Sequence, residues 1–203
     1  MKIKPEKITL TTKDGQVLQG NYFHTQNTKC ALLLHQFSKD KTSWIQLIET
    51  IMTHHSILAI DLRGHGESTG NYTTYSEKEF KSMREDVECA MNFLKKEGFK
   101  EQNISLIGAS IGANLAQNHS AKNKTDKTIL LSPGLNYKGI ELIIKDTKTL
   151  LIVSKEDTYS YKSVQEIEKK CPHAEAIYLE NKGHGTNMLS NELISSIHLF
   201  LIE

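Results

Sequence analysis

Short apolar segments alternate along the chain with longer segments in which apolar residues recur every three or four positions. The apolar segments cover residues 30–35, 56–62, 104–108, 128–132, 149–154 and 174–179. Continuous apolar runs of this length are typical of strands that are covered on both faces, as in a parallel sheet between helices. The helical spacing covers residues 42–53, 77–97, 110–122, 162–170 and 187–201. The pattern therefore predicts repeated βαβ units and a doubly wound, mostly parallel α/β sheet.

The first part of the chain has a different pattern. Residues 7–12 and 16–23 are two strand-like segments on either side of Lys13-Asp14-Gly15. Asp-Gly tolerates the positive φ of tight hairpin turns, so we expect a leading antiparallel hairpin. Further along, Ser76 and Glu79 form a capping box at the start of the longest helical segment. With only three prolines and no linker or internal repeat, residues 1–203 are predicted to form a single domain.

Composition narrows the class of protein. Of 203 residues, 24% are charged and 38% are hydrophobic, and the net charge is +1. This balance gives no basic face for nucleic acid. Cys30, Cys89 and Cys171 are far apart, which indicates neither a disulfide framework nor a zinc site. Since no segment has the apolar length of a signal peptide or a membrane span, we expect a soluble, cytoplasmic protein. Composition does not define an oligomeric state.

One motif carries candidate chemistry. Residues 108–112 read Gly-Ala-Ser-Ile-Gly and match G-x-S-x-G between a predicted strand and a predicted helix. Glycines at both ends allow strand and helix to approach closely, and the turn aims the Ser110 hydroxyl outward. The Ile111 amide then lies at the start of the helix, where unpaired N–H groups favour an anion. Ser110 is a candidate nucleophile; the alternative is a small-residue turn with a helix cap.

A serine nucleophile needs a base and an acid that orients the base. Among nine histidines, His184 lies between two glycines in a loop after the last apolar segment. For the acid, Asp157 follows the end of the strand predicted at 149–154, and Glu156 is the alternative. The sequence favours Asp157 because it lies one position further into the turn.

With these residues in place, the chain resembles an α/β-hydrolase, as a small, cap-less serine esterase or lipase-like member. Ser110, Asp157 and His184 match the order of nucleophile, acid and base. Residues 32–44 look like the family's oxyanion loop, and residues 59–68 contain its D-x-R-G-x-G-x-S pattern, whose role there is mostly structural.

The resemblance also implies an oxyanion hole. Its donors would be the backbone N–H groups of Phe37 and Ile111, with His35 supporting the loop rather than reacting. Gln36 departs from the pattern, because glycine normally follows that histidine. Two alternatives remain open: a differently shaped hole for a smaller substrate, or a Gln36 side-chain amide that serves as a donor.

A second departure concerns access to the site. Many family members insert a helical cap before the strand that carries the acid, whereas residues 133–148 leave room here for one short helix. The expected site is open and suited to short acyl groups.

The leading functional prediction is a serine hydrolase that cleaves small-molecule carboxylic esters or thioesters without a metal or organic cofactor. Two alternatives are a serine peptidase or amidase of the same fold, and a noncatalytic binding protein that retains it.

Overall fold

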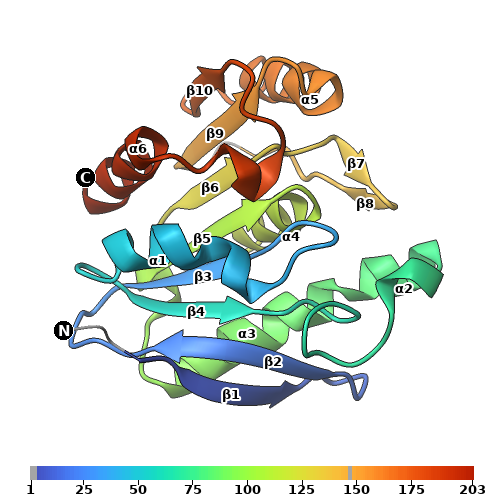
Figure 1. The fold of residues 1–203 in the computed structure, drawn as a ribbon, viewed down its shortest axis with the longest axis vertical. Helices are drawn as coiled ribbons and strands as arrows, with labels where there is room; N and C mark the ends of the chain where they lie inside the picture. Colours follow the sequence, from blue (N-terminus) through green and yellow to red (C-terminus); the bar gives the residue numbers. More distant parts are fainter. Residues whose placement is uncertain (1–3, 146–147) are drawn as a thin grey trace.

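The computed structural model describes residues 4–145 and 148–203, and within them an eight-stranded sheet forms the centre of the molecule (Figure 1). Its strand order is β1-β2-β4-β3-β5-β6-β9-β10. The strands are β1 (Glu6–Thr11), β2 (Val17–Phe23), β3 (Cys30–Leu34), β4 (Ser56–Ile60), β5 (Ile104–Ala109), β6 (Thr128–Leu131), β9 (Thr149–Ser154) and β10 (Glu175–Leu179). From β4 to β10 all neighbours are parallel, whereas β1 and β2 form an antiparallel hairpin at one edge. The predicted fold class and leading hairpin are confirmed.

Helices cover both faces of the sheet (Figure 1). They are α1 (Ile45–Ile51), α2 (Glu77–Ser82), α3 (Arg84–Lys96), α4 (Ile111–Ser120), α5 (Thr158–Glu168) and α6 (Asn191–Ile202). Alternate strand residues face opposite sides: Leu32 and Leu34 pack in the cluster with α3, α4 and α5, while Leu33 packs with α1 and α6. Both faces are thus buried, which explains why the strands are continuously apolar. Within the described residues, no helix is long and apolar enough to cross a membrane.

Two predicted elements differ from the structure. The helix expected over residues 77–97 is divided into α2 and α3 at Met83. Here Met83 N donates to the Phe80 carbonyl and Asp86 N donates to the Met83 carbonyl, so the turn is tighter than an α-helix. The capping box of Ser76 and Glu79 is confirmed at the start of α2.

The segment 133–148 also differs, because it forms a small hairpin rather than a short helix; residues 146–147 lie outside the described residues. Its strands are β7 (Asn136–Tyr137) and β8 (Ile140–Glu141), and the turn places Lys138 and Gly139 at φ 52° and 80°. Gly139 is required there, since a Cβ would lie 2.4 Å from the Glu77 side chain.

The connections place the loops after β3 and β5 side by side. Strand β3 lies between β4 and β5, with Leu34 opposite both Ile60 and Gly108. The chain leaves β3 toward β4 on one side and leaves β5 toward β6 on the other, so this is the point where the strand order reverses. A crevice outside the carboxyl ends of the strands is expected at such a point.

Candidate active site

Ser110 stands at the turn between β5 and α4. Its backbone has φ 54° and ψ −119°, outside the ordinary regions for a residue with a side chain. Strain of this kind costs roughly 1–3 kcal/mol and persists only where the surroundings impose it. Here the surroundings are well packed, because all ten residues of α4 are buried.

The two glycines of the motif are required by close contacts. A Cβ on Gly108 would lie 2.2 Å from the Gly112 carbonyl oxygen, and one on Gly112 would lie 2.3 Å from the Leu34 carbonyl oxygen. Strand β5, helix α4 and the end of β3 therefore meet without room for a methyl group. This is the crowding that the sequence pattern predicts, and it brings the loop after β3 against the start of α4.

The structure brings His184 and Asp157 together. His184 Nδ1 lies 2.6 Å from Asp157 Oδ2, while Asp157 Oδ1 accepts a hydrogen bond from Ser160 N at 3.4 Å. Asp157 caps α5, so its carboxylate is fixed at a helix start. Burial raises the pKa of Asp157, but hydrogen bonds from His184 and Ser160 outweigh burial and leave this pKa below its ordinary value.

Glu156, the alternative acid, contacts the backbone of the histidine loop rather than the imidazole. Its carboxylate accepts from Gly183 N at 2.7 Å, from Asn181 N at 2.8 Å and from the Ser154 hydroxyl at 2.7 Å. The hydrogen bonds from Gly183 and Ser154 lower the pKa of Glu156 to about 2. The two adjacent acids thus hold different parts of the same loop.

Two further side chains hold this loop, and sequence reasoning did not assign either contact. The Ser132 hydroxyl, at the end of β6, accepts from Gly185 N at 2.9 Å. Gln36 accepts from Thr186 and donates to the His184 carbonyl. The side-chain amide of Gln36 is therefore engaged by the histidine loop, with one N–H group donating to the His184 carbonyl. In the sequence, the only signal for these contacts was that Gln36 stands where the family normally has glycine.

The buried ring of His35 holds the loop after β3. His35 is fully buried; its Nδ1 lies 2.8 Å from the Gln36 carbonyl and its Nε2 accepts from Leu62 N at 3.0 Å. Burial lowers the pKa of His35 to about 4, which keeps the ring neutral and in one tautomer. Among the described residues, neither Phe37 N nor Ile111 N donates to a protein acceptor, so both amides can donate to a ligand.

The β7–β8 hairpin supplies an aromatic residue to the same place. The Tyr137 hydroxyl lies 2.9 Å from Ser160 Oγ, donates to the Ser132 carbonyl at 3.1 Å and interacts with the Ser110 side chain. Its ring stands edge-on to His184, with centroids 6.4 Å apart. Tyr137 thus lies beside the candidate base, and burial raises its pKa to about 12.

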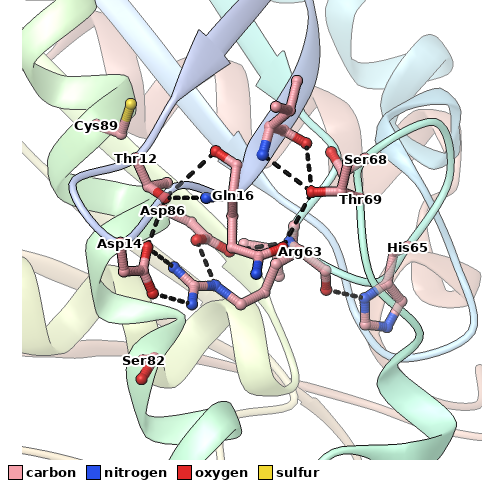
Figure 2. Close-up of polar contacts among 12 residues, drawn as sticks. Thr12, Asp14, Gln16, Arg63, His65, Ser68, Thr69, Ser82, Asp86 and Cys89 are labelled. Carbon is pink, nitrogen blue, oxygen red and sulfur yellow. Dashed lines mark hydrogen bonds and ion pairs between the residues drawn. The ribbon is translucent and has the colours of Figure 1, made fainter.

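The D-x-R-G-x-G-x-S segment is tied into the fold rather than into the site. Arg63 lies between Asp14 and Asp86 (Figure 2). Its Nη1 donates to Asp14 Oδ2 at 2.6 Å, and its Nε donates to Asp86 Oδ1 at 2.7 Å. Asp61 accepts from Lys41 Nζ at 2.6 Å, and the Ser68 hydroxyl donates to the Asp61 carbonyl. These contacts agree with the structural role that the resemblance implies.

A cavity of about 190 Å³ opens beside the oxyanion loop. It is lined by Phe37, Tyr72, Thr73, Tyr75, Phe80 and Lys138. Phe37 carries a candidate oxyanion amide, and Lys138 follows Tyr137 directly in the sequence; the described residues that line the cavity do not include Ser110 or His184. Its walls are mainly aromatic, and its volume is smaller than that of ordinary drug-sized pockets.

Comparison with known proteins places this geometry in a family. Residues 30–186 match the sequence model of the family described as serine aminopeptidase, S33. The chain belongs to this α/β-hydrolase family. The match begins at β3 and ends at the loop that carries His184, so it contains every candidate site residue.

Individual relatives agree with the family assignment. The chain is 28% identical over 141 residues to monoacylglycerol lipase abhd6-A of Xenopus laevis. The matched region covers 63% of this chain and 40% of the lipase. The chain thus spans well under two thirds of that relative's length. Two solved structures share the fold of this α/β-hydrolase. The esterase Pf2001 of Pyrococcus furiosus has a TM-score of 0.80 at 19% identity, over 98% of this chain and 91% of the esterase. The esterase EaEST of Exiguobacterium antarcticum has a TM-score of 0.77 at 12% identity, over 98% of this chain and 100% of the esterase.

Proposed function

We propose that this protein is a serine hydrolase that cleaves carboxylic esters or thioesters with short acyl groups. The observation that carries the proposal is the combination of a strained Ser110 turn with a His184–Asp157 pair at 2.6 Å. The proposed catalytic residues are Ser110, His184 and Asp157, and the proposed oxyanion donors are Phe37 N and Ile111 N.

The proposed mechanism gives each of these groups one role. His184 Nε2 takes the proton from Ser110 Oγ as the oxygen attacks the acyl carbon, and Asp157 stabilises the resulting imidazolium through Nδ1. The negative oxygen of the tetrahedral intermediate accepts hydrogen bonds from the two free amides, and losing one such donor costs roughly 3 kcal/mol in related reactions. The bond to the leaving group breaks, and His184 returns the proton to it. Water then attacks the acyl-enzyme by the same route.

The preference for short acyl groups rests on the cavity and on the small hairpin. A volume of about 190 Å³ holds a short chain or one ring, and the segment before β9 forms the short hairpin β7–β8 instead of a helical cap. A long acyl chain would extend into water, where its apolar surface gains little from binding.

The family description gives a second candidate, hydrolysis of an amide next to a free amino terminus. Such a substrate carries an ammonium group, which an acidic side chain would bind. Among the described residues lining the cavity beside Phe37, the charged residue is a cation, Lys138. This charge favours a neutral or anionic ester over an aminopeptidase substrate.

The test compares p-nitrophenyl esters from acetate to palmitate with amino-acid p-nitroanilides, using wild type and Ser110→Ala. We expect Ser110-dependent turnover of esters that declines as the acyl chain lengthens. Ser196→Ala, on the exposed side of α6, is the matched serine control and should behave as wild type. Faster turnover of the anilides would favour the peptidase, and an absence of turnover and of fluorophosphonate labelling would favour a noncatalytic binding protein.

A further inference from the structure

Gln36 connects the two loops on which the proposed chemistry depends. It lies directly before Phe37, and its side chain is buried, with 6% of the residue exposed. Its Oε1 accepts from Thr186 N at 2.6 Å and from the Thr186 hydroxyl at 3.1 Å, and its Nε2 donates to the His184 carbonyl at 3.3 Å. One amide therefore binds three groups on a loop about 150 positions away in the sequence.

The histidine loop is shaped around this amide. Gly185 has φ 59°, and a Cβ there would lie 2.0 Å from Gln36 Oε1. Only a residue without a side chain leaves space for the amide at this distance. Gly185 thus leaves the space that the Gln36 side chain fills, which argues for a specific contact between the two loops.

We propose that Gln36 is a positioning residue that fixes His184 relative to the oxyanion amide of Phe37. The inference rests on the proposed function and adds to it a residue that touches neither substrate nor reacting atoms. Asp157 orients the imidazole through Nδ1, whereas Gln36 fixes the backbone that carries the ring.

The chemistry of the amide suits this role. Thr186 presents donors and His184 presents an acceptor, so the partner must both accept and donate. A carboxylate at position 36 accepts only, and a glycine leaves these buried groups unpaired. Glutamine satisfies all three without adding a charge beside the base.

The test uses Gln36→Leu, which keeps the volume and removes the hydrogen bonds. Its matched control is Gln117→Leu, because Gln117 is also buried and donates from α4 to the carbonyls of Ile143 and Lys145, away from the site. Thr186→Val is a graded variant that loses only the hydroxyl contact. For each protein, kcat and KM are measured with a short acyl ester. The labelling rate is measured with a fluorophosphonate inhibitor.

We expect Gln36→Leu to lower kcat and the labelling rate by roughly 10- to 100-fold, because small displacements of a base are costly in the transition state. KM should change little. Thr186→Val should show a smaller loss, and Gln117→Leu should retain the wild-type kcat even if it melts at a lower temperature. Equal effects of Gln36→Leu and Gln117→Leu on kcat would overturn the positioning role.

A measurement that needs no activity keeps this inference separate from the proposed function. Amide hydrogen exchange should show faster exchange at Thr186 in Gln36→Leu, while Gly183, held by Glu156, keeps its protection. Unchanged exchange at Thr186 would overturn the contact itself. If wild type neither turns over esters nor labels at Ser110, the proposed function and the positioning role are overturned together, and the exchange data still decide whether the loops are coupled.

Discussion

The tripeptide Gly-His-Gly occurs twice in this chain, at residues 64–66 and 183–185, and its two glycines have nearly the same φ both times. The first glycine has φ 77° in each loop, and the second has φ 54° or 59°. Each second glycine leaves space for a buried polar side chain, Asp61 in one loop and Gln36 in the other. The two glycines thus adopt matching positive φ in both loops.

The two imidazoles nevertheless have different surroundings. His65 is 3% exposed, stacks on Tyr72 with centroids 4.0 Å apart, and places Nδ1 3.0 Å from the Arg63 carbonyl. The His184 side chain is 36% exposed and places Nδ1 against the carboxylate of Asp157. A histidine is a candidate base where a carboxylate contacts one ring nitrogen and the side chain is partly exposed. The Gly-His-Gly tripeptide by itself provides neither feature.

The side chains that lie against the second glycine of each loop differ in charge. Asp61 is a carboxylate, and Lys41 neutralises it with its Nζ at 2.6 Å. Gln36 is neutral and adds no charge next to His184. Asp61 therefore belongs to a charged network that stabilises the fold, whereas Gln36 leaves Asp157 as the acid that contacts the imidazole of His184.

The largest expected effect tests whether only one of these histidines reacts. Ser110→Ala and His184→Ala should each lower kcat by roughly 10⁴-fold or more, and the double variant should lose little further, because the groups act as a unit. His65→Gln should stay within about threefold of wild type. Turnover of a p-nitrophenyl ester of short chain length, with folding checked by circular dichroism, measures all four. A multiplicative loss in the double variant would contradict the triad.

The second prediction separates the two adjacent acids. Asp157→Asn should lower kcat by roughly 10⁴-fold, because an amide does not stabilise the imidazolium and favours the wrong tautomer. Glu156→Gln still offers an oxygen to the loop amides and should cost kcat less than about tenfold. The assignment is wrong if Asp157→Asn keeps its activity while Glu156→Gln loses it.

The sheet was predictable because its physical cause is local. Buried strands are apolar on both faces, and the Ser110 turn needs glycines at 108 and 112 wherever the chain goes afterwards. The break at Met83 was not predictable, because the apolar stripe continues through it and only the tighter hydrogen bonds change.

The contacts that hold the histidine loop were not predictable for a different reason. Gln36, Ser132 and Glu156 come from the ends of three strands, and each meets the loop only after the sheet has formed. The sequence identified Gln36 as unusual without indicating what it contacts. Tyr137 was missed because its hairpin has two-residue strands, too short to show a period.

The third prediction concerns the stability of the first loop. Arg63→Met should lower the free energy of unfolding by about 3–5 kcal/mol, because Asp86 is fully buried and would lose its counter-charge. Asp14→Asn removes the partner that is 41% exposed and should cost about 1 kcal/mol or less. Urea unfolding measures both. Equal costs would mean that burial does not decide the strength of these pairs.

The smallest effect concerns protons taken up by buried histidines on unfolding. Burial lowers the pKa of His35 to about 4 and also lowers the pKa of His65, whereas an unfolded histidine has a pKa near 6.5. Between these values the unfolded state binds more protons, so stability is complete above about pH 6.5 and declines as the pH falls toward 4. His35 contributes up to about 1.4 kcal/mol per pH unit in that window, and the lowered pKa of His65 acts in the same direction.

His65→Phe sharpens this comparison, because phenylalanine can stack on Tyr72 but does not titrate. At pH 7 the variant should lose about 1 kcal/mol with the hydrogen bond to the Arg63 carbonyl. Below pH 6.5 its unfolding free energy should fall less steeply than that of wild type, so the two curves converge as the pH approaches 5. Parallel curves from pH 7 to pH 5 in urea unfolding would mean that His65 binds the same number of protons folded and unfolded, and that its burial between the glycines does not keep it neutral.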